Sequence, residues 1–213
     1  MIKTLKIQSK FKIKNSKLKN LMFELVKKIR ERTGAGMVVI KKAIEEAGGD
    51  EEKAIEILRK QGQSKAAKKA DREVHEGVVA SYVHSNNRVA ALVKLYCETD
   101  FVARNSEFQE LAKDIAMHVV AMSPKFIKPE EVSDATIEKE KEIWKEQLAQ
   151  EGKPAEMMEK IMAGKEKKFR EESALLTQTF VKNPEMTIGE LIVEKIGKMG
   201  ENIQIGEISR IEL

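Results

Sequence analysis

The sequence predicts an α+β fold, and the order of its hydrophobic patterns leads to that class. From Leu21 onward apolar residues recur every three or four positions, as on one face of a helix, and over 77–98 they alternate instead. Helical spacing then returns until a last alternating stretch over 203–211. We expect an N-terminal three-helix bundle of the UBA-like type, a small antiparallel sheet flanked by helices, and an inserted helical hairpin.

Composition excludes several classes of protein. The chain has 213 residues, of which 35% are charged, and much of its net charge of +4 lies in the N-terminal tail. The rest is close to neutral, which argues against a nucleic-acid-binding protein driven by phosphate contacts. One cysteine excludes an internal disulfide framework, and three histidines beside it leave no zinc-binding spacing. We therefore expect no metal and no cofactor. Because no apolar run approaches the roughly 20 residues of a membrane span, we expect a cytoplasmic protein.

Residues 1–20 form a basic extension, with seven lysines and no acidic residue before Glu24. An organellar transit segment would normally be richer in Arg and Ser. A nucleic-acid-binding arm is a second possibility. We favour a third interpretation, an extension of little function with Met22 as the natural start of the folded part.

The first folded part is a bundle of three short helices over 21–62. The helices are expected to begin at Leu21, Met37 and Glu51, and to end before Thr33, at Ala47 and at Gln61. Glycine-containing turns separate them, and Asp50 is a natural N-cap for the third. Bundles of this size usually bind other proteins. We expect recognition through the exposed first helix and the Arg32–Gly36 turn.

A β-hairpin follows a short basic linker, 63–72. Strands over 77–84 and 88–98 alternate apolar and polar residues. The turn between them, Ser85-Asn86-Asn87, suits a hairpin because Asn tolerates a positive φ. A helix over 106–121 comes next, with apolar residues on one face.

The segment between that hairpin and that helix, Cys97–Asn105 (CETDFVARN), is the strongest candidate for a functional site. A strand, a short polar turn and a helix can hold a few side chains on a rigid stem, and Thr99 and Asp100 are the turn-compatible pair. Phe101 is unusual beside them, because a large aromatic there must either enter the core or be presented to a partner. A capped helix start with Phe101 in the core is the alternative.

The C-terminal part is predicted to contain a projecting helical hairpin and to complete the core. Two long, highly charged helices, 135–150 and 154–182, have sparse apolar positions and a turn at Gly152–Pro154. A final helix over 188–199, capped by Thr187, leads to a strand over 203–211, which we expect to pair with the earlier hairpin. The expected domains are an extension, a three-helix module, a linker, a core domain, the helical hairpin and a segment that completes the core: 1–20, 21–62, 63–72, 73–134, 135–182 and 183–213.

No enzyme site emerges from the sequence. Cys97 has His75 and His84 nearby in sequence, but a strand cysteine is ordinarily a small core residue, and no nucleophile, phosphate-binding or zinc-protease motif accompanies it. The basic residues over 65–69 lack the interleaved aromatics that stack bases in an RNA-binding patch. We therefore expect no catalytic residue and no direct nucleic-acid binding.

Several motifs of the chain occur in the order that one known protein family shares. The opening run is Val26–Gly36 (VKKIRERTGAG), and the most characteristic motif is Cys97–Arg104 (CETDFVAR). Further matches are Lys41–Ala43, Ala47–Asp50, Ala116–Pro129, Gly152–Ile161, Lys168–Phe169, Thr177–Val181 and Gly200–Ile203 (GENI). With these motifs the chain resembles the bacterial elongation factor Ts family, and the resemblance runs from Leu21 to the C-terminus. Val38-Val39-Ile40 replaces the Met-Asp-Cys that is frequent in the family, a core-like change that touches no functional residue.

The resemblance implies a guanine-nucleotide exchange factor that binds elongation factor Tu in its GDP form. Four residues would press into the partner's nucleotide-binding domain and displace Mg²⁺, so that GDP leaves and GTP reloads: Thr99, Asp100, Phe101 and Val102. Docking residues would lie mainly in the N-terminal module, with one at the hairpin turn: Val26, Arg30, Arg32, Thr33, Gly34, Gly36 and His84. Short members of the family are homodimers, which implies a homodimer here. The alternatives are a protein-binding adaptor built on the UBA-like module and a ribosome- or RNA-binding protein.

Overall fold

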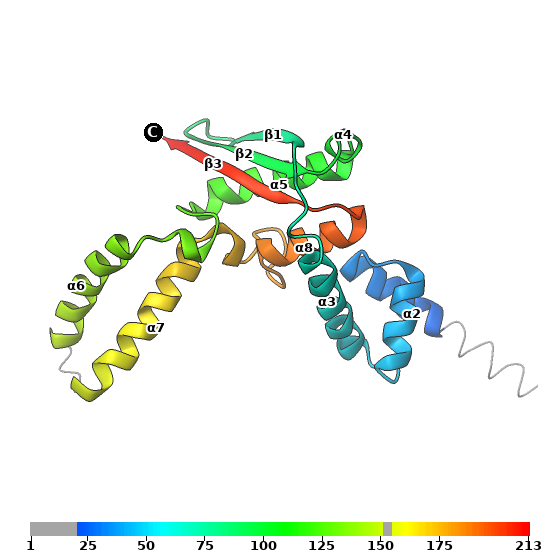
Figure 1. Ribbon diagram of the computed structural model, residues 1–213, viewed down its shortest axis with the longest axis horizontal. Helices are drawn as coiled ribbons and strands as arrows, with labels where there is room; N and C mark the ends of the chain where they lie inside the picture. Colours follow the sequence, from blue (N-terminus) through cyan, green and yellow to red (C-terminus); the bar gives the residue numbers. More distant parts are fainter. Residues whose placement is uncertain (1–20, 151–154) are drawn as a thin grey trace, which may run out of the picture. The chain divides into compact units, whose positions relative to one another are not determined.

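The computed structural model describes residues 21–150 and 155–213, so the N-terminal extension and the predicted turn at Gly152–Pro154 lie outside the described residues. The chain forms two compact units (Figure 1): residues 21–71 with 193–200, and residues 72–192 with 201–213. A sheet in the second unit and helices in both confirm the α+β class. No helix in the described chain is long and apolar enough to cross a membrane.

The first unit packs three helices around a small aliphatic core. Residues 21–33 are helical, and α2 (Met37–Glu46) and α3 (Glu51–Ala67) follow. Gly48 and Gly49 end α2 with φ of 64° and 89°, left-handed angles that strain a residue with a Cβ. The core consists of these buried side chains: Val26, Ile29, Ile40, Ala43, Ile44, Ala54, Ile55 and Leu58.

The third helix is longer than the sequence predicts. Asp50 caps it as expected, accepting a hydrogen bond from the backbone N of Lys53 at 3.1 Å. The expected end at Gln61 is wrong, because α3 continues through Gly62 to Ala67. A helical glycine costs only about 1 kcal/mol relative to alanine, and the segment beyond it is rich in Ala and Lys, which favour helix. The first half of the predicted linker is therefore helical.

The second unit contains a three-stranded antiparallel sheet in the order β1 (Glu76–Val83), β2 (Val89–Cys97) and β3 (Gln204–Glu212). The central strand is β2, so the prediction that the last strand pairs with the hairpin is confirmed. Asn87, in the turn between β1 and β2, has the positive φ expected of it, 55°.

Helix α5 (Ser106–Met122) covers one face of this sheet (Figure 1). Alternate residues of β2 lie on the covered face and are buried: Ala91, Val93, Leu95 and Cys97. From the helix, Phe108, Leu111 and Ile115 are buried against them. The C-terminal end of β2 therefore rests on a well-packed core.

Gly206 on β3 contributes to this packing through its lack of a side chain. The register between β2 and β3 shifts at Lys94 and Leu95, which places Gly206 in a bulge. A Cβ at Gly206 would stand 2.1 Å from the ring of Tyr96. The tyrosine ring thus occupies space that only glycine leaves open.

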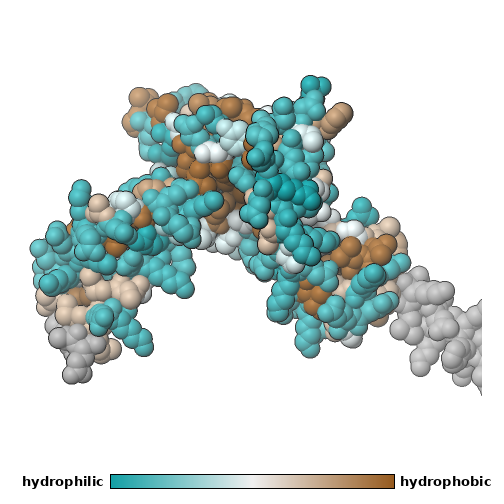
Figure 2. Space-filling view, in the orientation of Figure 1, coloured by the Kyte–Doolittle hydropathy of each residue, from teal (hydrophilic) through white to brown (hydrophobic). Residues whose placement is uncertain are grey.

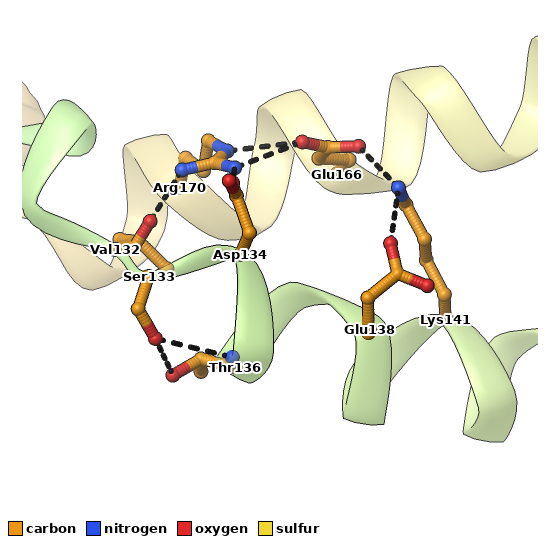
Figure 3. A network of polar contacts seen from close by, with 8 residues as sticks. All are labelled: Val132, Ser133, Asp134, Thr136, Glu138, Lys141, Glu166 and Arg170. Atoms are coloured by element: carbon orange, nitrogen blue, oxygen red, sulfur yellow. Dashed lines mark hydrogen bonds and ion pairs between the residues drawn. The ribbon is translucent and has the colours of Figure 1, made fainter.

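A pair of charged helices, α6 (Asp134–Gln150) and α7 (Ala155–Ser173), forms the expected helical hairpin. Figure 3 shows polar contacts between the start of α6 and the end of α7: Arg170 donates to the carbonyl of Val132 at 2.6 Å and to Asp134 at 3.1 Å. Glu166 accepts from Arg170 at 3.1 Å and pairs with Lys141 at 3.2 Å. The surface of the two helices in Figure 2 is mostly hydrophilic, in agreement with their sparse apolar positions.

Helix α7 ends at Ser173, and the expected end at Lys182 is wrong. The carbonyl of Ser173 accepts hydrogen bonds from the backbone N of Lys125 and of Phe126, at 3.0 and 3.2 Å. Leu175 N then donates to Phe126 O at 2.9 Å, and Leu175 is fully buried. Pairing with a segment distant in sequence therefore replaces further helical turns, and a single 3-10 turn, η2 (Leu175–Thr177), follows.

The last helix agrees with the prediction at both ends. It is α8 (Ile188–Met199), and Thr187 precedes it as the expected cap. Glu190 N donates to Thr187 Oγ1 at 3.2 Å, while Thr187 N donates to the Glu190 carboxylate at 2.9 Å. These reciprocal bonds are a capping box.

Candidate functional site

The polar turn predicted at Thr99 and Asp100 is the start of a one-turn helix, α4 (Asp100–Ala103), shortly after β2. Thr99 caps it, since its hydroxyl accepts a hydrogen bond from Val102 N at 3.4 Å. Ala103 is buried, but the side chain of Phe101 is 83% exposed. The alternative that places Phe101 in the core is therefore wrong.

Asp100 and Val102 complete this short helix. The Asp100 carboxylate is partly exposed and pairs with the guanidinium of Arg104, one helical turn later, at 3.2 Å. Val102 is half-buried. The predicted motif thus presents one aromatic and one carboxylate outward from a backbone that is seated on the sheet.

Cys97, the last residue of β2, is part of the buried core that supports α4, and it has no features of a nucleophile. Its side chain is fully buried, and its thiol donates to the carbonyl of Thr99 at 3.2 Å. Burial raises the pKa of the Cys97 thiol to about 11, which keeps it protonated near neutral pH. His75 and His84 are exposed and hydrogen-bond to Glu73 and Tyr82, so the structure does not bring them to the thiol.

The connection between Thr99 and the C-terminal segment is absent from the sequence-based prediction. Glu201 accepts hydrogen bonds at one carboxylate oxygen from Glu98 N at 3.1 Å and Thr99 N at 3.0 Å. Its other oxygen accepts from the Thr99 hydroxyl at 2.6 Å. In return, the Glu98 carboxylate accepts from Asn202 N at 2.6 Å. The only sequence signal for this contact is the match of Gly200–Ile203 to a family motif, which assigns no role to its residues.

The predicted docking residues of the first unit lie in the helix over 21–33 and the turn after it. Arg30 is exposed, and Arg32 pairs with Glu51 at 2.9 Å and Glu52 at 2.7 Å. The hydrogen bonds that Arg32 donates to Glu52 and Glu51 raise its pKa. Val26 is only 2% exposed and lies in the core, so its predicted direct contact with a partner is corrected to a packing role.

The turn itself is built from local hydrogen bonds. The Thr33 hydroxyl donates to Ile29 O at 2.7 Å, and Gly34 N donates to Arg30 O at 2.8 Å. Gly34 has a φ of 64°, the left-handed conformation that glycine adopts without strain at a helix end. Gly36 has ordinary extended angles as the N-cap of α2. The structure therefore brings Arg30, Arg32 and this turn together at one end of the helix.

His84 lies at the hairpin turn, as predicted, and is exposed. The sheet face opposite α5 carries exposed apolar side chains from all three strands: Val79, Val83, Leu92 and Ile211. Across the same face Lys94 and Glu207 form an ion pair of 2.7 Å. Within the described residues, no group of His, Cys, Asp and Glu side chains has the arrangement of a metal site.

Comparison with known proteins gives a consistent result. Residues 8–213 match the family model described as elongation factor TS. The chain is 58% identical over 182 residues to the elongation factor Ts of Thermosipho melanesiensis, covering 85% of this chain and 93% of that protein. It is 53% identical to that of Fervidobacterium nodosum, over 89% of this chain and 96% of the relative, and 52% identical to that of Carboxydothermus hydrogenoformans, over 89% and 88%. The chain belongs to the elongation factor Ts family, the nucleotide exchange factors of elongation factor Tu.

Proposed function

We propose that this protein promotes GDP release from elongation factor Tu by pressing α4 into the partner's nucleotide-binding domain. The observation that carries the proposal is Phe101, a large apolar side chain that is 83% exposed on a helix seated at the end of β2. Such a side chain has little to do for its own fold. It has the size and the fixed origin that a displacing element needs.

The target of this displacement is the Mg²⁺ that bridges the partner and its nucleotide. Magnesium demands near-ideal octahedral geometry at about 2.0–2.1 Å, so a small shift of its ligands costs much of its binding. Phe101 would move a segment that carries those ligands, and Asp100 would act beside it through its carboxylate. By linkage, factor and nucleotide each weaken the binding of the other. The protein is thus an exchange factor and carries out no chemical step itself.

The magnitudes limit what Phe101 can do alone. A hundredfold weakening of nucleotide binding requires about 2.7 kcal/mol. Complete burial of one Phe side chain supplies roughly 1.5–3 kcal/mol. Phe101 therefore provides a large part of the effect, and the remainder must come from Asp100, Thr99, Val102 and the docking surface.

Docking is assigned to the UBA-like three-helix module. Arg30, Arg32 and the turn Thr33–Gly36 form the surface, while Val26 supports it from the core. Because Arg32 is already paired with Glu51 and Glu52, a partner would have to accept this guanidinium in its existing geometry or compete for it. We place this interaction in the cytoplasm, where protein synthesis takes place.

A homodimer is part of the proposal. The exposed apolar side chains Val79, Val83, Leu92 and Ile211 share one sheet face, and a second copy would bury them. His84 at the edge of that face would then reach the elongation factor bound to the other protomer. Sedimentation that gives only monomer at micromolar concentration, with full exchange activity, would remove this part of the proposal.

The exchange function is tested by stopped-flow measurement of fluorescent GDP release from elongation factor Tu. The protein should accelerate release strongly in millimolar Mg²⁺. In excess EDTA, where the metal is already absent, the additional acceleration should become small. An acceleration of equal size with and without Mg²⁺ would leave exchange intact but contradict the Mg²⁺ mechanism.

A further inference from the structure

The backbone at the start of α4 is held by a side chain that lies 102 residues away in sequence. Beyond Cys97 the strand pairing ends, so the backbone N–H groups of Glu98 and Thr99 have no strand partner. The Glu201 carboxylate accepts both, at 3.1 and 3.0 Å. It therefore does for these two residues what a neighbouring strand does for the rest of β2.

The same carboxylate fixes the cap of α4. The Thr99 hydroxyl donates its one hydrogen to Glu201 at 2.6 Å and can then accept, through its lone pair, from Val102 N at 3.4 Å. A hydroxyl that is oriented in this way cannot rotate to another acceptor without losing a charge-assisted hydrogen bond. Glu201 thus sets both the position of the Thr99 backbone and the direction of its cap.

Hydrogen bonds run in both directions between residues 98–99 and 201–202, which fixes the two segments against displacement along each other. Asn202 N donates to the Glu98 carboxylate at 2.6 Å, and the Asn202 amide donates to Arg72 O at 2.8 Å. Arg72 in turn faces the same Glu98 carboxylate at 3.4 Å. Residues 98–99 and 201–202 therefore clasp each other from both sides.

Phe101 depends on this clasp because it has almost no packing of its own. Its side chain is 83% exposed, so only the backbone of α4 determines where the ring points. A helix of four residues is too short to be stable by itself. The anchors at its N-terminal end must therefore define its position, with Ala103, which is buried, as the anchor at the other end.

We propose that Glu201 is a positioning residue for nucleotide exchange, which holds Thr99 and α4 so that Phe101 meets the partner in a fixed orientation. This inference rests on the exchange function proposed above. Without Glu201, α4 would have to be ordered during each encounter, and part of the binding free energy of Phe101 would be spent on that ordering. The loss would appear in the release step and much less in docking.

The test compares Glu201→Ala, Glu201→Gln and the control Glu130→Ala, an exposed glutamate in the same unit. At saturating factor, Glu201→Ala should slow GDP release about tenfold, while its affinity for elongation factor Tu·GDP changes less than threefold. Glu201→Gln, which keeps the shape and one carbonyl acceptor, should recover part of the rate. Amide hydrogen exchange at Glu98 and Thr99 should become faster in Glu201→Ala, and the control should match the natural protein in every measurement.

A double mutant separates positioning from general damage. If Glu201 acts through Phe101, adding Glu201→Ala to Phe101→Ala should slow release less than twofold further. Full multiplication of the two effects, or equal losses in affinity and in release rate, would overturn the positioning role. If Phe101→Ala alone leaves release unchanged, the exchange mechanism has failed instead. If Phe101→Ala slows release and both Glu201 variants do not, only the inference about Glu201 has failed. Should Glu201→Ala not fold, Glu201→Gln carries the same comparisons.

Discussion

The helix α4 and the turn over 33–36 are both short connecting segments, the first capped by Thr99 and the second turned at Gly34. Glutamates accept hydrogen bonds at both segments, but from different groups. Glu201 accepts from backbone N–H groups and a hydroxyl, which are fixed to the chain. Glu51 and Glu52 accept from Arg32, a long side chain on the surface. A bond to the backbone fixes the chain itself, whereas an exposed ion pair is screened by water and salt and restrains a side chain alone. The fixed backbone of α4 is therefore suited to displacing a segment of a partner. The turn over 33–36 is suited to binding one.

A clear loss of stability should come from disturbing the packing between β2 and β3, in the sheet that α4 follows. Gly206→Ala places a Cβ where the ring of Tyr96 now lies, 2.1 Å away, and overpacking of this kind costs about 1–3 kcal/mol. We expect a clear loss in urea unfolding followed by the fluorescence of Trp144, the one tryptophan of the chain, which lies in the second unit.

Gly36→Ala is the matched glycine variant in the first unit. A Cβ at Gly36 would have no atom within 4 Å, and the φ of −69° suits alanine. Its unfolding, followed by circular dichroism, should match that of the natural protein. Equal stability of the two variants would contradict the difference in packing around Gly206 and Gly36.

Acid should weaken the second unit first. His118 is fully buried, with Nε2 3.1 Å from the Gln178 side-chain oxygen and Nδ1 accepting from Val181 N at 3.4 Å. Burial lowers the pKa of His118 below its usual value, although the hydrogen bond to Gln178 acts in the opposite direction. The neutral His118 side chain stabilises the fold fully above the pKa that histidine has in the unfolded chain, about 6.5. As the pH falls below that value, the unfolded chain binds a proton before the folded protein does, and the stabilisation is lost.

We therefore expect the free energy of unfolding reported by Trp144 to fall as the pH is lowered below about 6.5. His118→Gln should flatten this slope. His75→Gln, a change at an exposed histidine, should not. All three histidines lie in the second unit, so an equally steep loss in the first unit would contradict the assignment to His118.

A smaller and purely functional difference is expected between the two surfaces. Arg32→Ala should weaken binding of elongation factor Tu·GDP several-fold, with an unchanged melting temperature because its ion pairs are exposed. Raising the concentration of this variant should restore the full rate of GDP release. If the rate at saturation falls as much as the affinity, the turn takes part in nucleotide release and the division of roles is wrong.

The features that could be predicted from the sequence are those that depend on residues close together in the chain. The glycine turns, the Asp50 and Thr187 caps, the β1–β2 hairpin and the position of Phe101 after β2 all follow from neighbouring residues. Elongation factor Tu was predicted as the partner from the resemblance to the elongation factor Ts family. Local patterns also explain the burial of Val26, which the resemblance includes among the docking residues, because its spacing with Ile29 places both side chains in the core.

The remaining features depend on contacts between segments distant in sequence. Helix α7 has no local reason to end at Ser173; it ends because residues 125–127 pair with the chain there. Glu201 could not be connected to Thr99 from one sequence, since nothing in a glutamate that follows a glycine specifies a partner 102 residues away. Tertiary pairing overrides helix propensity at the first site and anchors the start of α4 at the second.

The most direct test of this account is Phe101→Ala, measured once for folding and once for function, with Phe108→Ala as the comparison. Phe108 is fully buried, and truncation of a core Phe costs about 3–5 kcal/mol, so that variant should melt much earlier. Phe101→Ala should melt like the natural protein and release fluorescent GDP from elongation factor Tu markedly more slowly at saturation. A Phe101→Ala protein that exchanges nucleotide at the natural rate would contradict the central claim, whatever its melting temperature.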